Sequence, residues 1–287
     1  MPHARPTKPS LLFSLRAVCR LGRVGLHLVY GLLIVGLAYP CIGPGKRRHI
    51  RHRWSRNLLS ILGVRLNRVG VAAHGARMLV ANHISWLDIF VINAVEPVAF
   101  VSKNDILGWP VIGTLARHSE TLFLARGSHR SAHSASQLIA EILAAGTTVA
   151  VFPEGTTTNG RCVLPFRGAL LQGALNAGVP VQPVALAYLT MRGEHSRAAA
   201  YCGDTSLLES LWSIAAAPSL CASMTHLAPL SVTGWERRAL AAQCEASVRV
   251  ALRHSPADPM QHAAERVQQA EPDSVSGALT ESAIGAG

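Results

Sequence analysis

Hydrophobic positions divide the chain into an apolar N-terminal stretch and a longer region of alternating short and long patterns. Residues 24–43 form the most apolar stretch, close to the roughly 20 residues that a membrane helix needs. From Arg77 onward, short apolar runs typical of buried strands alternate with longer amphipathic patterns. This alternation predicts an α/β fold with a mostly parallel sheet that is flanked by helices on both faces.

The same pattern places the individual elements and the domains. Strands are expected at residues 78–81, 98–102, 121–124, 147–152, 181–188 and 224–227, and helices at 88–94, 106–118, 131–145, 166–177, 206–214 and 236–253. After about Ser255 large apolar side chains are almost absent, which is typical of disorder. The chain therefore divides into a basic, hydrophobic membrane-anchoring segment (1–56), a single α/β domain (57–254) and a disordered tail (255–287).

Basic residues flank the apolar stretch on both sides. Three arginines precede it between residues 16 and 23, and five lysines and arginines follow between residues 46 and 53. A single membrane crossing normally has positive charge mainly on one side, whereas a helix lying in one leaflet brings both flanks to the same anionic surface. Membrane association is expected in either arrangement, and a buried core helix is the alternative.

The charge and composition of the chain indicate which kind of molecule it binds. The 287 residues include 27 Lys and Arg against 16 Asp and Glu, a formal net charge of +11, and 49% of them are hydrophobic. This balance favours an anionic membrane surface, and no nucleic-acid-binding module is recognisable. The six cysteines are scattered without a CxxC pair and the thirteen histidines without an HExxH arrangement, so reduced cysteines and no metal site are expected.

A histidine and an aspartate stand five positions apart directly after the predicted strand 78–81, in the stretch ANHISWLDIF. Ser85 and Asp88 fit a capping-box pattern, which would make His83 an ordinary loop residue. On a regular helix the two side chains of His83 and Asp88 would point about 140° apart. They can meet if His83 lies in the turn and Asp88 in the first helical turn, where Asp88 would orient a catalytic base.

A second candidate follows the strand at 147–152, where Pro153 and Gly155 mark a turn that presents Glu154. The carboxyl ends of parallel strands meet at one sheet edge, so Glu154 is expected near His83. The alternative for Glu154 is a solvated carboxylate in a turn. No GxSxG nucleophile turn accompanies the pair, so a base at His83 would activate a hydroxyl of the substrate.

Together these stretches resemble the glycerolipid acyltransferase family, which includes 1-acyl-sn-glycerol-3-phosphate acyltransferase. NHISWLD matches the family's NHxxxxD box and FPEGT matches its FPEGT box, in the same order. TLFLAR at 121–126 and VPVQPVA at 179–185 look like two further blocks, and the similarity covers roughly residues 77–188. The order of four such blocks behind an apolar segment makes the resemblance specific.

The resemblance implies an acyl transfer to a lysolipid, most simply 1-acyl-sn-glycerol-3-phosphate, at the cytoplasmic face of a bacterial inner membrane. His83 would take the proton of the acceptor hydroxyl as that oxygen attacks an acyl thioester, and Asp88 would orient His83. An acyl carrier protein or coenzyme A thioester would be the donor substrate, without a bound cofactor. The residues implied to bind substrate are Asn82, Lys103, Arg126, Glu154, Gly155, Thr156 and Arg167.

One position departs from the family pattern. Lysophosphatidate acyltransferases usually continue FPEGT with arginine, but Thr157 follows here, and Arg161 or Arg167 could supply the cation. The FPEGTT form resembles members that act on other lysolipids, including lyso-ornithine lipid, whose head group lacks phosphate. Lyso-ornithine lipid O-acylation is therefore the alternative reaction, and a non-catalytic membrane-surface protein is the alternative of another class.

Overall fold

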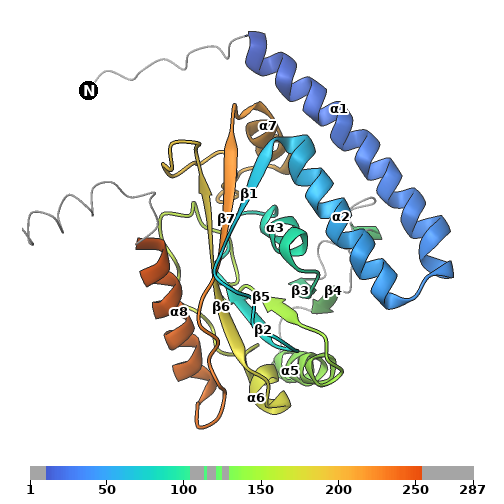
Figure 1. The fold of residues 1–287 in the computed structure, drawn as a ribbon. Helices are drawn as coiled ribbons and strands as arrows, with labels where there is room; N and C mark the ends of the chain where they lie inside the picture. The colour runs from blue at the N-terminus through green and yellow to red at the C-terminus, as the bar shows by residue number, and fades with distance from the viewer. Residues whose placement is uncertain (1–10, 104–112, 115–120, 125–128, 254–287) are drawn as a thin grey trace, which may run out of the picture.

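The computed structural model describes residues 11–103, 113–114, 121–124 and 129–253. Within these residues the chain forms a seven-stranded sheet of order β1-β7-β6-β2-β5-β3-β4 (Figure 1). The five strands from β6 to β4 run parallel, whereas β7 pairs antiparallel with β6 and parallel with β1. The strands are β1 (Val64–Val69), β2 (Met78–Ala81), β3 (Ala99–Lys103), β4 (Thr121–Leu124), β5 (Val149–Val151), β6 (Val181–Leu189) and β7 (Leu220–His226).

Helices cover both faces of the sheet, because successive side chains of a strand point to opposite faces. Leu79 and Ala81 of β2 belong to a core shared with α2, α3 and α7, while Met78 and Val80 belong to a core shared with α5, α6 and α8. The mostly parallel α/β fold predicted from the pattern is confirmed. The helices are α1 (Leu11–Leu33), α2 (Pro44–Leu62), α3 (Asp88–Val95), α5 (His129–Ala144), α6 (Gln172–Ala177), α7 (Leu207–Ala216) and α8 (Arg237–Arg253).

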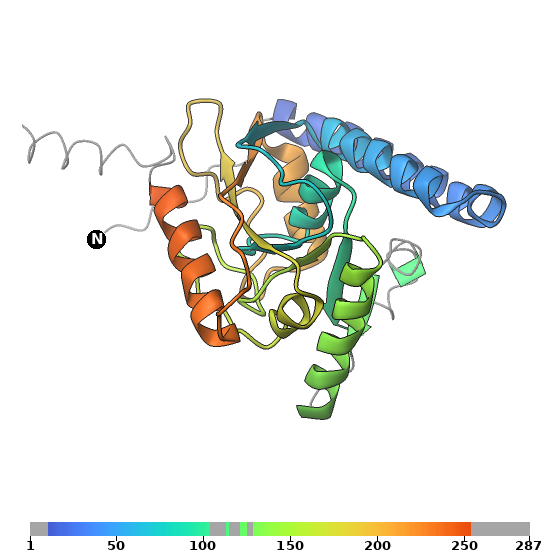
Figure 2. The ribbon, with the colours of Figure 1, turned by 60° about the horizontal axis from the view of Figure 1, so that its bottom comes forward.

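The N-terminal region is a helical hairpin. α1 continues through a π-helical turn (Ile34–Ala38) and a 3-10 turn (Tyr39–Cys41), and α2 then returns beside it, away from α8 (Figure 2). The stretch Ser14–Cys41 is long and apolar enough to cross a membrane, with a mean hydropathy of 1.8. Many of its large apolar side chains face outward, including Leu26, which is 74% exposed. α2 runs through the predicted boundary between residues 56 and 57, which therefore marks no end of an element.

Most predicted elements are present, with local corrections. The helix predicted at 166–177 begins later, with α6 at Gln172, because residues 168–171 form turns. The backbone packs closely there: a side-chain carbon at Gly168 would lie 2.6 Å from the Arg237 carbonyl oxygen. The strand predicted at 224–227 starts earlier, at Leu220, and neither β1 nor α2 was predicted. The predicted helix 106–118 lies largely, and the tail 255–287 wholly, outside the described residues.

A buried polar network joins the amino end of β2 to the end of α3. Arg77 donates to Gln182 Oε1 at 2.9 Å and forms an ion pair with Glu96, which also binds His226 Nε2 at 2.8 Å. Burial opposes ionisation of Glu96, but the hydrogen bond to His226 and the charge of Arg77 outweigh it and lower the pKa of the Glu96 carboxyl. The network thus connects β2, α3, β6 and β7.

Replacing Arg77 by alanine should lower the free energy of unfolding by about 3 kcal/mol. This is the low end of the range for breaking a buried ion pair, because the Glu96 side chain keeps 18% exposure. Urea denaturation followed by circular dichroism measures the change, with Arg192→Ala at an exposed position as the matched control. Equal stability of the two variants would show that the network does not hold these elements together.

Candidate active site

The turn between β2 and α3 brings His83 and Asp88 together. His83 lies in the turn, Asp88 is the first residue of α3, and the Nδ1 atom of His83 is 2.8 Å from Asp88 Oδ2. The same oxygen accepts the backbone N–H groups of Ile84 at 2.7 Å and Ser85 at 2.9 Å. One carboxylate therefore binds both the backbone of the turn and the imidazole, whereas Leu87, the N-cap residue of α3, makes no side-chain capping hydrogen bond.

The Asp88 carboxylate is fully buried and is surrounded by donors. Its second oxygen, Oδ1, accepts the hydroxyl of Tyr188 at 2.7 Å. Burial, the charge of Asp88 and this hydrogen bond raise the pKa of Tyr188 well above its usual value, so the phenol stays protonated and donates. The two backbone N–H groups can only donate, and the protonated Tyr188 phenol donates as well, so Asp88 acts as a hydrogen-bond acceptor toward all three.

This arrangement determines which imidazole nitrogen can act. A carboxylate can only accept a hydrogen bond, so an Nδ1–H donates to Asp88 and the neutral ring carries its lone pair on Nε2. The ring stacks on Phe152 with centroids 4.0 Å apart and an interplanar angle of 14°. The side chain keeps 20% exposure, and no residue in the described ranges hydrogen-bonds to Nε2. His83 is therefore held in one orientation with a basic nitrogen available to a substrate.

Glu154 lies next to His83 but contacts its backbone. One Glu154 oxygen accepts the N–H of His83 at 2.7 Å, and the other accepts the N–H of Leu164 at 2.8 Å. The residue is 2% exposed, so it is not a solvated turn carboxylate. Burial raises the pKa of Glu154, although the two backbone hydrogen bonds oppose this. Both oxygens bind the backbone, so the structure favours a positioning role over direct contact with a head group.

The loop after β5 is also tied to the His83 turn. The N–H of Thr158 donates to the His83 carbonyl oxygen at 2.9 Å, and Gly155 has a positive φ of 73° at the exposed bend. A side-chain carbon at Gly155 would lie 3.4 Å from the Arg167 guanidinium, which places that cation at the rim of the site. Thr156 is exposed beside it.

The other predicted site residues are distributed differently. Asn82 is buried, and its amide exchanges two hydrogen bonds with the Leu186 backbone at 2.8 and 3.0 Å, so it extends the pairing of β2 with β6 and does not face a substrate. Lys103 is the last residue of β3, but its side chain is not among the parts that the structure describes. Arg126 lies outside the described residues. Thr157, at the departure from the family pattern, donates its hydroxyl to the Tyr201 carbonyl oxygen.

Two site residues were not predicted from the sequence. Tyr188 lies 100 residues after Asp88 and reaches it because β6 pairs with β2. No local sequence pattern predicts that contact. Phe152 could have been predicted from the sequence, because an aromatic residue directly precedes the Pro-Glu-Gly turn.

Among the described residues, no group of three or more His, Cys, Asp or Glu side chains lies close enough together to hold a metal ion.

A groove of about 720 Å³ lies beside the loop after β5. Asn159, from the loop after β5, lines it together with Arg197 and Asp204. Ser210, on its other side, accepts the indole N–H of Trp86 at 3.0 Å. The groove therefore combines both signs of charge beside the segment that holds His83.

Comparisons with known proteins find acyltransferases that are similar to this chain. A family described as Acyltransferase matches residues 66–187. A lyso-ornithine lipid O-acyltransferase from Pseudomonas aeruginosa is 37% identical over 206 residues, which is 72% of this chain and 79% of that protein. A 1-acyl-sn-glycerol-3-phosphate acyltransferase from Neisseria meningitidis is 33% identical over 248 residues, which is 85% of this chain and 95% of that protein.

The fold also matches a solved structure. The crystal structure of the 1-acyl-sn-glycerophosphate acyltransferase PlsC from Thermotoga maritima superposes with a TM-score of 0.65 at 21% identity, covering 88% of this chain and 99% of that one. At this identity the match establishes the fold.

Replacing Tyr188 by phenylalanine should lower the free energy of unfolding by about 1–3 kcal/mol, because a buried carboxylate oxygen loses its donor. Tyr201→Phe is the matched control, since no hydrogen bond of its hydroxyl is found within the described ranges. Chemical denaturation of both variants measures the difference. Equal stability of Tyr188→Phe and Tyr201→Phe would contradict the assigned contact.

Proposed function

Because the chain belongs to the family of 1-acyl-sn-glycerol-3-phosphate and lyso-ornithine lipid acyltransferases, we propose that it transfers a fatty acyl group from a thioester to the free hydroxyl of a lysolipid. The acyl donor is a thioester formed with either acyl carrier protein or coenzyme A. A single observation carries the proposed chemistry: His83 binds a buried Asp88 through Nδ1 at 2.8 Å, which leaves Nε2 as a base.

The reaction follows from this geometry. The acceptor hydroxyl gives its proton to Nε2 of His83 as its oxygen attacks the thioester carbonyl carbon. The Asp88 carboxylate stabilises the imidazolium that forms. The carbon–sulfur bond then breaks, and the departing thiolate takes the proton back from His83. The acyl group passes directly to the lipid oxygen, so no nucleophilic side chain of the protein is needed.

The helical hairpin supports a membrane location. α1 carries exposed apolar side chains such as Leu26, Val29 and Leu33, and the chain has a net charge of +11. Apolar area together with attraction to anionic lipids is the physical basis of surface binding. We place the enzyme at the cytoplasmic face of the membrane, where its thioester donors and its lipid acceptor meet.

Replacing His83 by alanine should reduce acyl transfer by about 10²–10⁴-fold, the usual contribution of a positioned base. Transfer of a labelled acyl chain to a lysolipid measures this, with binding to vesicles as a check on membrane association. The exposed His74→Ala variant is the matched control and should retain full activity. Undiminished transfer by His83→Ala, or no transfer by the wild-type protein, would favour a non-catalytic membrane-surface protein.

Two acceptors are supported by different observations. Arg167, at the rim beside Gly155, suits the phosphate of 1-acyl-sn-glycerol-3-phosphate, because its planar group can make two charge-assisted hydrogen bonds. Lyso-ornithine lipid is supported by Thr157, whose hydroxyl is used by Tyr201, and by the similarity to lyso-ornithine lipid acyltransferases. The first acceptor would give phosphatidic acid.

Acyl transfer from a labelled donor is measured in parallel with 1-acyl-sn-glycerol-3-phosphate and with lyso-ornithine lipid, and the lipid that becomes labelled is the acceptor. If the phosphate acceptor is used, Arg167→Gln should raise its KM about tenfold, equivalent to roughly 1.4 kcal/mol, with a smaller change in kcat. The exposed Arg192→Gln variant controls for the loss of one positive charge. An unchanged KM would remove Arg167 from the head-group site, and use of neither lipid would refute both acceptors.

A further inference from the structure

The groove beside the loop after β5 is attached to the turn that carries His83. We name it the Asn159 groove, after the residue of that loop which lines it. Thr158, directly before Asn159, donates its N–H to the His83 carbonyl oxygen at 2.9 Å. Ser210 of α7 lines the groove from another side and accepts the indole N–H of Trp86 at 3.0 Å. Two sides of the groove are therefore hydrogen-bonded to the catalytic turn.

The third side of the groove is the segment between β6 and α7. Ala200 and Cys202 line it, and Tyr201 between them donates its N–H to the Ile84 carbonyl oxygen at 3.0 Å. All three sides of the groove thus bind the segment 83–86. A head group in the groove would lie against the turn whose imidazole is the base.

The Asn159 groove contains a cation and a carboxylate that are not paired. Arg197 and Asp204 both line it, both are exposed, and neither side chain forms a hydrogen bond or ion pair within the described ranges. Glu209 also lines the groove but is used by the fold, because it accepts the N–H and the hydroxyl of Ser206 in the capping box of α7, each at 2.8 Å. One positive and one negative group therefore remain available to a ligand.

A second arginine adds positive charge on the Arg197 side. Burial and the positive charges of Arg161 and Arg197 lower the pKa of His195. A hydrogen bond between this imidazole and the Asn159 backbone opposes the lowering. Both guanidinium groups therefore act on one imidazole beside Asn159, so that side of the groove attracts an anion.

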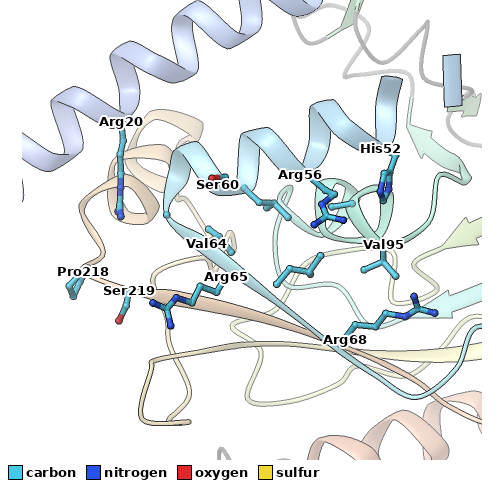
Figure 3. Close-up of a pocket in the computed structure, with 14 residues that line it drawn as sticks. Arg20, His52, Arg56, Ser60, Val64, Arg65, Arg68, Val95, Pro218 and Ser219 are labelled. Carbon is cyan, nitrogen blue, oxygen red and sulfur yellow. The ribbon is translucent and has the colours of Figure 1, made fainter. Parts of the chain in front are cut away.

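The hollow of about 640 Å³ between α2 and β1 differs in this respect (Figure 3). None of its lining residues, all of which are described, is acidic. Arg65 and Arg68 lie three positions apart on β1, so their side chains point to opposite faces of the strand and do not form one site. Of the two hollows, only the Asn159 groove combines unpaired groups of opposite charge with contacts to the catalytic turn.

Unpaired groups of opposite charge select a head group that carries both charges. A carboxylate would form charge-assisted hydrogen bonds with Arg197, and an ammonium group would do so with Asp204. A phosphate head group carries negative charge only, so Asp204 would repel it. The ornithine head group of lyso-ornithine lipid has a free carboxylate and a free side-chain ammonium, whereas 1-acyl-sn-glycerol-3-phosphate has neither.

We propose that the Asn159 groove binds the zwitterionic amino-acid head group of the acceptor and thereby selects lyso-ornithine lipid. Arg197 binds the carboxylate of the head group, and Asp204 binds its ammonium. The assignment rests on the proposed acyl transfer for the reaction of the bound lipid, but head-group binding itself requires no turnover. Arg167 is not among the residues that line the groove, so a phosphate acceptor at Arg167 would use a different site.

The test measures binding of three lipids with the same 3-hydroxyacyl chain to the full-length protein in neutral detergent, by calorimetry and without an acyl donor. The ornithine lipid, acylated on its α-amino group, carries both charges. The norvaline lipid lacks only the ammonium, and the 1,4-diaminobutane lipid lacks only the carboxylate.

Each groove variant has a control that loses the same charge outside the groove. Asp204→Asn is compared with Glu236→Gln, and both residues are exposed. Arg197→Gln is compared with Arg192→Gln, which are likewise both exposed. Circular dichroism checks folding, and Arg197→Lys, which keeps the charge but not the planar fork, replaces Arg197→Gln if that variant does not fold.

The wild-type protein and both controls should bind the ornithine lipid about tenfold more tightly than either analogue, because each analogue loses one charge-assisted contact. Asp204→Asn should bind the ornithine and norvaline lipids equally and still discriminate against the diaminobutane lipid. Arg197→Gln should show the reverse. Equal binding of all three lipids by the wild-type protein, discrimination that persists unchanged in both groove variants, or tighter binding of 1-acyl-sn-glycerol-3-phosphate than of the ornithine lipid would overturn the proposal.

Acyl transfer to the same lipids from a labelled thioester is measured separately. If the binding pattern is found but no lipid is acylated, the head-group site is supported and the proposed acyl transfer is refuted. If all three lipids are acylated with equal kcat/KM and their binding does not depend on Arg197 or Asp204, the acyl transfer is supported and the site is refuted.

Discussion

The buried carboxylate of Asp88 is the interaction on which the site depends. It accepts from the His83 ring, from two backbone N–H groups of the turn and from the Tyr188 hydroxyl. A buried charge is costly unless it is fully hydrogen-bonded, and here donors of the turn before α3 and of the central strand β6 supply those bonds. The stability of the turn and the tautomer of the imidazole thus have the same cause.

A second buried carboxylate completes the support with a different role. Glu154 holds the His83 backbone N–H and the Leu164 N–H, and so joins the loop after β5 to the turn after β2. These strands are neighbours in the sheet, and β6, which carries Tyr188, lies on the other side of β2. The order of three adjacent strands therefore determines which side chains surround the imidazole.

Much of this arrangement could be predicted from local sequence, and the rest depends on long-range pairing. β2 and the start of α3 were located because an apolar run meets a Ser–Asp capping pattern. β1 was missed because most of its residues are exposed, so an edge strand shows little apolar periodicity. Tyr188 and the backbone-binding role of Glu154 arise from contacts across 100 and 71 residues, which no local pattern encodes.

The protonation of the His83 ring tests the central claim most directly. Nitrogen-15 NMR of histidine-labelled protein at neutral pH, with His83→Ala used to assign the signal among thirteen histidines, distinguishes the two ring nitrogens. The account predicts a protonated Nδ1 and an unprotonated Nε2. A neutral ring protonated at Nε2 would show that Asp88 does not orient the base, and the proposed chemistry would then be wrong.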